Sequence, residues 1–161
     1  MRKITILLAT VGAMLLLVSG VALAAQIACK GGTCTGTNQK DRITGTAGRD
    51  MVNAKNGGDT VFGRASADVI RGGFGADKIY GQGGNDILHG GSGPDRLVGG
   101  PGRDTVDADQ GNDSVNAADG TLDSVTCGVG TDTAIIDEVD VSRQSFEDFV
   151  RLSSCENTMV R

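Results

Sequence analysis

Aspartate recurs at every ninth position through the middle of the chain. The nine members of this series are Asp41, Asp50, Asp59, Asp68, Asp77, Asp86, Asp95, Asp104 and Asp113. Carboxylates are hard oxygen donors, and a regular array of them suits a divalent cation such as calcium. The spacing therefore predicts a row of cation sites, which the chain must fold to bring together.

An aliphatic residue follows each of these aspartates by two positions. These residues are Ile43, Val52, Val61, Ile70, Ile79, Leu88, Leu97, Val106 and Val115. Three units, which begin at Gly72, Gly90 and Gly99, read G-G-x-G-x-D-x-U-x, where U is a large aliphatic residue. A repeat of this length and composition is the signature of a calcium-binding parallel β-helix.

The repeat dictates a simple geometry. The x-U-x segment is long enough for a short strand with U pointing inward, and the six preceding residues must turn the chain. Glycine at positions one, two and four allows positive φ and close approach of the backbone. Two units would make one coil of 18 residues with a sheet on each side, so that aspartates stack in two columns. After Asp113 the register slips by one residue to Asp123, and it resumes with Asp132.

This stacking creates an electrostatic problem. Neighbouring strands lie about 4.8 Å apart, and carboxylates at such distances repel by about 1 kcal/mol per pair in water and by more at lower dielectric. One inward aliphatic residue per unit offsets little of the entropy lost when a glycine-rich chain becomes ordered. Oxygen-only donors in a flexible cage favour calcium over magnesium or zinc. We therefore expect folding to be coupled to calcium binding.

Two other interpretations of the repeat remain open at this point. The tract could be a disordered acidic linker, or a metal-free β-solenoid held by hydrogen bonds from the backbone to aspartate. Individual aspartates in the less regular units, namely Asp41, Asp50 and Asp132, could simply cap turns.

Residues 36–135 resemble the RTX, or hemolysin-type calcium-binding, repeat family, on the strength of the three regular units. The resemblance implies a parallel β-roll in which calcium lies between stacked loops, bound by the sixth-position aspartate and by loop carbonyl groups. Carried onto this chain, the ligands would be Asp59, Asp68, Asp77, Asp86, Asp95, Asp104 and Asp113. Backbone oxygens would come from loops 72–75, 81–84, 90–93 and 99–102, which include Gly73, Gly75, Gly91, Gly93, Gly100 and Gly102. The large toxins and proteases of that family carry an effector domain and a C-terminal export signal, neither of which we expect here.

The N-terminus has the features of a secretory signal peptide. Arg2 and Lys3 precede a largely apolar run from Ile4 to Val18, and the small residues Ala22-Leu23-Ala24 suit cleavage after Ala24 or Ala25. We therefore expect a secreted or extracellular protein, released or held at the cell surface, with no membrane attachment after cleavage.

The remaining chain divides into three parts. We expect an N-terminal cap with a cysteine pair at 26–35, the repeats at 36–135 and a C-terminal cap at 136–161, with a short helix near Ser145 to Val150. The predicted fold is thus all-β: a parallel β-roll, or two-sheet β-solenoid of nonapeptide repeats, with a short and partly helical C-terminal cap.

The 4 cysteines allow three disulfide connectivities. Export makes disulfide bonds permissible. We favour Cys29–Cys34 and Cys127–Cys155, because a long solenoid separates the two pairs. The second bond would pin the C-terminal tail to the last coil.

Composition argues against other kinds of function. The formal net charge of −5 argues against nucleic acid as a partner. The single histidine, His89, falls at an outward position that favours a solvated role, and we find no constellation typical of an enzyme.

An interaction module, adhesin-like and directed at an unknown protein or surface, is the alternative function. Its motivation is a set of apolar residues at outward positions, which could form two short ridges. They are Phe62, Tyr80 and Val98 on one sheet and Met51, Val69 and Ile87 on the other.

Overall fold

The computed structural model describes residues 24–138 and 155–161. Nearly all of the expected signal peptide and the expected helix near 145–150 lie outside these residues. Within the described part, no helix has the length and apolar character needed to cross a membrane.

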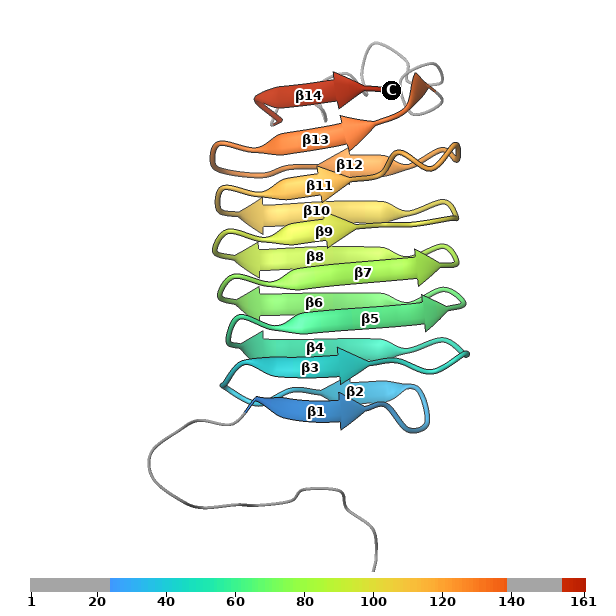
Figure 1. Ribbon diagram of the computed structural model, residues 1–161, viewed down its shortest axis with the longest axis vertical. Coiled ribbons are helices and arrows are strands. Elements are labelled where there is room, and N and C mark those ends of the chain that lie inside the picture. Colours follow the sequence, from blue (N-terminus) through green and yellow to red (C-terminus); the bar gives the residue numbers. More distant parts are fainter. Residues whose placement is uncertain (1–23, 139–154) are drawn as a thin grey trace, which may run out of the picture.

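Two parallel sheets face each other, and the chain passes from one to the other at each half-coil (Figure 1). The first sheet has eight strands, in the order β1 (Ala25–Ala28), β3 (Asp41–Thr44), β5 (Thr60–Ala65), β7 (Lys78–Gly83), β9 (Arg96–Val98), β11 (Ser114–Asn116), β13 (Thr133–Ile136) and β14 (Asn157–Val160). The second has six, in the order β12 (Ser124–Thr126), β10 (Thr105–Gln110), β8 (Ile87–Ser92), β6 (Val69–Phe74), β4 (Met51–Asn56) and β2 (Thr33–Thr35). The predicted two-sheet β-solenoid is confirmed.

The strand register follows the repeat. Ile79 pairs with Leu97 in the first sheet, one coil further along the chain. Beyond β11 the pairing shifts by one residue, so that Val106 pairs with Val125. The turn between β11 and β12 holds the additional residue, which is the slip predicted after Asp113.

The core consists of two facing columns of aliphatic side chains, each at most 4% exposed. The predicted columns are confirmed: Ile43, Val61, Ile79, Leu97 and Val115 in one, and Val52, Ile70, Leu88, Val106 and Val125 in the other. This core is only two side chains thick, so each coil depends on the coils above and below it.

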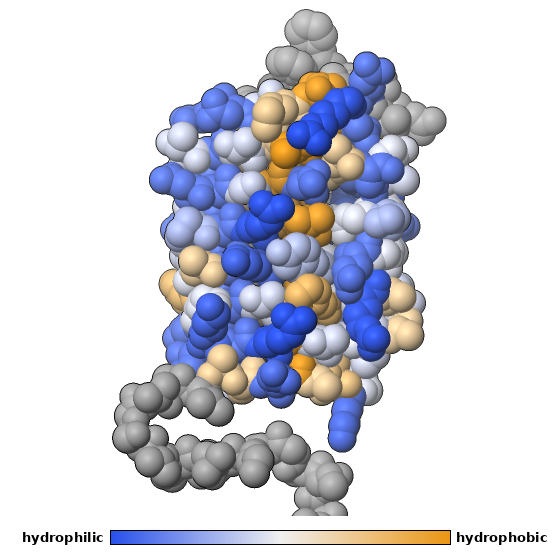
Figure 2. All heavy atoms as spheres, viewed as in Figure 1, coloured by the Kyte–Doolittle hydropathy of each residue, from blue (hydrophilic) through white to orange (hydrophobic). Residues whose placement is uncertain are grey.

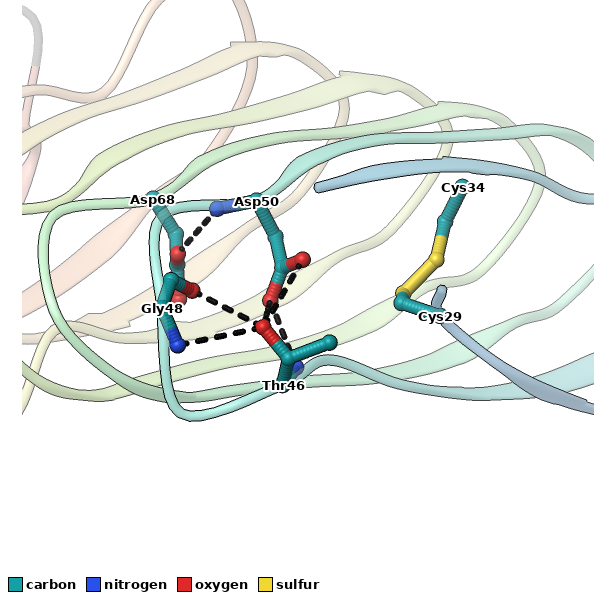
Figure 3. The surroundings of a disulfide bond; sticks show 6 residues. All are labelled: Cys29, Cys34, Thr46, Gly48, Asp50 and Asp68. Carbon is teal, nitrogen blue, oxygen red and sulfur yellow. Dashed lines mark hydrogen bonds between the residues drawn. A yellow bond between two sulfur atoms is a disulfide. The ribbon is translucent and has the colours of Figure 1, made fainter. Parts of the chain in front are cut away.

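Both ends of the stack carry a disulfide bond, with the pairing that we favoured. Cys29–Cys34 lies in the first coil (Figure 3), and Cys127–Cys155 ties the last turns to the tail. Strand β14 was not predicted, because its side chains are all exposed and show no alternation. It adds to β13 through the backbone, where Asn157 N donates to the Asp132 carbonyl at 3.1 Å.

Apolar side chains gather in a central column on the face turned to the viewer, with polar residues on either side (Figure 2). Phe62 and Tyr80 occupy outward positions of the neighbouring strands β5 and β7. Their rings stack with centroids 5.1 Å apart and planes 8° apart. The Arg42 guanidinium lies 4.5 Å from the centre of the Phe62 ring. These ring faces are therefore occupied by neighbouring coils, which makes the aromatic pair a contact along the stack.

Removal of the Cys127–Cys155 bond should release the tail locally. This bond closes a loop across 28 residues, which corresponds to about 3–4 kcal/mol in the chain-entropy account. In a Cys127→Ser/Cys155→Ser variant we expect faster hydrogen exchange at the amides of Asn157 and Arg161, which donate to Asp132 and Ile136. The amides of β7 should keep their protection.

The matched control is Cys29→Ser/Cys34→Ser, whose bond spans only 5 residues and accounts for about 2 kcal/mol. Equal acceleration of exchange along the whole stack would contradict the local role of the C-terminal bond.

Candidate metal centre

A ladder of aspartates runs along each side of the stack, inside the turns. Asp59 N donates to Asp77 Oδ1 at 2.7 Å, and Asp77 N donates to Asp95 Oδ1 at 2.8 Å. The other side has the same arrangement, in which Asp68 N donates to Asp86 Oδ1 at 2.8 Å. The carboxyl group of each aspartate is thereby fixed by the backbone of the preceding coil, 18 residues earlier.

The second oxygen of these carboxyl groups is buried and has no hydrogen-bond partner in the structure. This holds for Asp59, Asp68, Asp77, Asp86, Asp95, Asp104, Asp113 and Asp132. Each of these residues is at most 3% exposed. A buried polar atom without a partner costs about 1–3 kcal/mol, and more if the group is charged. The two columns of Oδ2 atoms therefore require a cation or a proton.

Glycines leave the room in which loop carbonyl groups approach one another. Gly75 has φ of 131°, and a Cβ there would collide with the carbonyl of Gly57. Gly93, with φ of 121°, stands in the same relation to the carbonyl of Gly75. At these positions the turns stack with a carbonyl oxygen of one coil directed at the glycine of the next.

Position-one glycines meet the expected close approach of the backbone but not the expected positive φ. Gly72 does not have the positive φ that we predicted for positions one, two and four alike. A Cβ on Gly72 would instead lie 2.5 Å from Asp77 Oδ2 and 2.5 Å from the Gly90 carbonyl oxygen. Glycine at this position makes space for the carboxylate, whereas positions two and four supply the turn.

Stacking imposes the same turn where glycine is missing. Positive φ values between 67° and 90° occur at the non-glycine residues Lys55, Arg64, Ser66, Gln82 and Asp109. All five occupy position two or four of their units. Such backbone costs about 1–2 kcal/mol for a residue with a side chain, so these turns persist because the neighbouring coils hold them.

At the N-terminal end, two threonines donate hydrogen bonds to the second carboxylate oxygen, so these aspartates need no cation. Thr46 donates to Asp50 Oδ2 from its backbone N at 2.6 Å and from Oγ1 at 3.0 Å (Figure 3). Thr37 likewise donates to Asp41 Oδ2, from its backbone N at 2.6 Å and from Oγ1 at 2.9 Å. Asp41 and Asp50 therefore cap turns, and the unpartnered oxygens begin at Asp59 and Asp68.

The C-terminal end extends the ladders beyond the predicted ligand set. Asp104 N donates to Asp123 Oδ1 and Asp113 N donates to Asp132 Oδ1, each at 2.8 Å. Asp132 was expected to be a possible turn cap, but its Oδ2 is buried like those of the regular units. The one-residue slip was the sequence signal that could have placed both residues in the ladders.

Burial is the main reason that the ladder carboxyl groups are hard to ionise. It raises the pKa of Asp95 and Asp104 to about 7, and that of Asp59, Asp68 and Asp113 to about 6. The hydrogen bond from the preceding backbone lowers each pKa, and the neighbouring aspartates raise it. Each carboxylate thus carries an unmet demand for positive charge.

The donors suit one class of ion. They are carboxylate and carbonyl oxygens, with no nitrogen or sulfur among the ladder residues, and they come from flexible turns, which favours calcium. The fold and this donor set define a calcium-binding parallel β-roll.

Comparison with known protein families supports a calcium-binding repeat. Four stretches of the chain, at residues 35–65, 53–88, 62–97 and 89–121, match the family described as the RTX calcium-binding nonapeptide repeat. The match covers more than half of the 161 residues, and the chain belongs to this family. The ion of this repeat is Ca²⁺, and the buried aspartate ladders fit it. No curated protein and no solved structure matches the chain.

Acid should stabilise the fold when calcium is absent. Aspartates with a pKa of about 6–7 in the fold and about 3.9 when unfolded bind more protons in the folded state. Their contribution is complete below about pH 4 and is lost as the pH rises through 6–7. In calcium-stripped buffer, we expect a β spectrum with a cooperative thermal transition at pH 4.5, and little of either at pH 7.5.

Saturating calcium should reverse this order, because protons compete with the ion for the same oxygens. Circular dichroism melts at pH 4.5, 6.0 and 7.5, with and without calcium, measure both trends. A calcium-free midpoint that rises with pH across this range would contradict the role given to the buried carboxyl groups.

Substitution of asparagine for aspartate should weaken calcium binding at a ligand position but not at a turn-capping position. Asp77→Asn removes the charge of an unpartnered oxygen, and we expect the calcium midpoint to rise about tenfold or more. Asp50→Asn keeps an oxygen to accept from Thr46 N, so the midpoint should stay within about twofold. Calcium titrations followed by circular dichroism test the pair, and equal shifts in both variants would refute the distinction.

Proposed function

We propose that this chain is an exported, non-enzymatic calcium-binding module whose coils become stable when calcium binds. The observation that supports this proposal is the double column of buried, unpartnered carboxylate oxygens. The proposed side-chain ligands are Asp59, Asp68, Asp77, Asp86, Asp95, Asp104, Asp113 and Asp132.

The energetics of the calcium-free state support the coupling. At neutral pH the stack can form only if buried carboxyl groups hold protons or face one another as charges, and both states cost free energy. A divalent cation bound by two successive turns removes this cost. Because the turns come together only in the stacked chain, the free energy of ion binding adds directly to the stability of the fold.

Backbone oxygens of the glycine turns complete the proposed sites. The glycines expected to contribute these oxygens are Gly73, Gly75, Gly91, Gly93, Gly100 and Gly102, all with positive φ. The turns that precede the eight-stranded sheet have glycine at position four in five successive coils: Gly57, Gly75, Gly93, Gly111 and Gly130. The turns on the other side include Ser66 at this position. We therefore assign the tighter sites to the column of Asp59, Asp77, Asp95 and Asp113.

Export would place the chain where calcium is available to stabilise the fold. The predicted signal peptide would deliver the chain to surroundings rich in calcium, where folding follows release. Cleavage after Ala24 would leave strand β1 whole, together with the donation from Ala25 N to Asp41 Oδ1 at 3.3 Å.

The interaction-module alternative lacks comparable support. Contacts along the stack account for the pairing of Phe62 with Tyr80 and with Arg42. Met51 and Ile87 are 54% and 39% exposed, which is ordinary for scattered surface residues. We therefore propose no second function.

A calcium titration of the chain from Ala25, with its disulfide bonds intact, tests the proposal. After removal of calcium at pH 7.5, we expect a largely disordered far-ultraviolet circular dichroism spectrum. Addition of calcium should produce the β spectrum, and magnesium at the same concentration should not. A β spectrum that persists unchanged without calcium would show that the ladders are structural turns and would overturn the coupling.

A further inference from the structure

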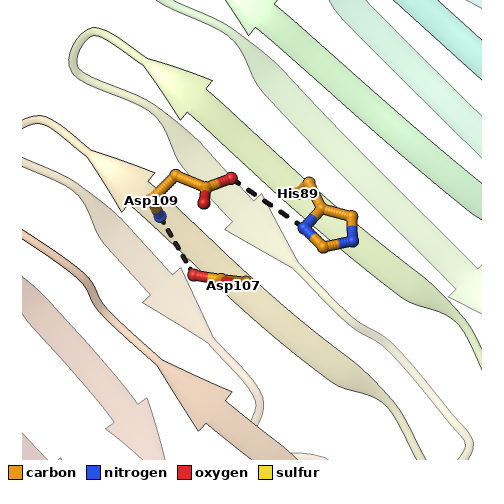
Figure 4. A network of polar contacts seen from close by, with 3 residues as sticks. All are labelled: His89, Asp107 and Asp109. Carbon is orange, nitrogen blue, oxygen red and sulfur yellow. Dashed lines mark hydrogen bonds and ion pairs between the residues drawn. The ribbon is translucent and has the colours of Figure 1, made fainter.

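A second polar cluster, of different composition, lies on the outer face of the six-stranded sheet (Figure 4). His89 belongs to β8, whereas Asp107 and Asp109 belong to the neighbouring strand β10. One imidazole nitrogen and one oxygen from each carboxylate all lie within 4.8 Å of one another. His89 Nδ1 is 3.8 Å from Asp109 Oδ2. The three side chains are half-buried, in contrast to the buried ladder aspartates.

The sheet register holds the cluster together. His89 pairs with Asp107 across the ladder of hydrogen bonds, and Gly91 pairs with Asp109. Alternation along β10 directs Asp107 and Asp109 to the outer face, with Ala108 buried between them. Asp109 N also donates to Asp107 Oδ1 at 3.2 Å. Residues 18 and 20 positions apart in the sequence therefore meet only when the coils stack.

The cluster has more negative charge than its surroundings balance. Within residues 24–138 and 155–161, neither carboxylate forms an ion pair with a lysine or an arginine. Arg71 lies beside His89 in the register, on β6, which is the side away from β10. The site thus offers three donor groups and an unmet demand for a cation.

We propose that His89, Asp107 and Asp109 form a second metal site, which binds a borderline transition-metal ion of the Zn²⁺ class. Imidazole nitrogen selects such ions over calcium and magnesium, which prefer oxygen alone. The site is therefore chemically distinct from the calcium ladders. The remaining coordination positions face solvent and take water.

The present spacing needs a small adjustment. Ligand atoms around tetrahedral zinc lie about 3.4 Å apart, given metal–ligand distances of about 2.1 Å. The His89–Asp109 separation of 3.8 Å is close to this value. Side-chain rotation at a half-exposed surface supplies the rest, because no backbone has to move. Once bound, the ion would link β8 to β10 across two coils.

The test is a Zn²⁺ titration by isothermal calorimetry of the untagged, calcium-saturated protein. We expect one equivalent to bind and a tenfold increase in calcium not to displace it. His89→Asn and Asp109→Asn should each weaken binding at least tenfold, with an unchanged circular dichroism spectrum in calcium. Glu156→Gln, at an exposed carboxylate outside the cluster, should bind zinc like the wild type.

The single histidine gives a direct second readout. Zinc should shift the ¹⁵N resonances of the His89 imidazole, most strongly at Nδ1. Displacement of zinc by calcium, full binding by His89→Asn, or an imidazole that does not respond would each overturn the proposal. These results are independent of whether calcium drives folding, because every titration is done on the folded protein and the coupling is tested separately by calcium removal.

Discussion

One hydrogen bond, repeated along both sides of the stack, governs this molecule. It runs from the backbone N–H of an aspartate to Oδ1 of the aspartate one coil further on. The bond sets the register between coils and fixes the carboxyl group in one orientation. It also leaves the second oxygen buried and brings like charges into a column. The interaction that holds the coils in register is thus also the one that places the buried oxygens for which we propose a cation.

The turns show how the backbone meets this constraint. Gly75 and Gly93 allow carbonyl groups of successive coils to approach, whereas Gly72 makes room for the carboxyl group of Asp77. At position two of the turns, Lys55 and Gln82 are held at positive φ where the next coils have Gly73 and Gly100. Pairing between strands must therefore offset local backbone strain in these units. In the regular units, glycine occupies the positions where stacking requires positive φ, so no such strain arises.

Much of this arrangement could be predicted because a nine-residue period leaves few choices. The inward columns around Ile79 and Leu88 and the shift before Asp123 follow directly from counting residues. Strand β14 could not be predicted, since its residues pair through the backbone and bury no side chains. The capping role of Thr46 depends on the orientation of its hydroxyl and N–H groups, which the spacing of the motif does not encode. The 18-residue coil does imply that His89 and Asp107 are neighbours, but the approach of Asp109 to His89 depends on side-chain orientation.

The threonine caps give the roll a direction. Asp41 and Asp50 are satisfied by Thr37 and Thr46, yet their own N–H groups donate to Asp59 and Asp68, each at 2.7 Å. The first coils are thus complete without an ion and present two donors that orient the first ion-demanding carboxyl groups. The first coils therefore present a preformed edge on which the next coil can stack. If folding begins at this edge, the coils would form in order from the N-terminal end towards the C-terminal disulfide bond.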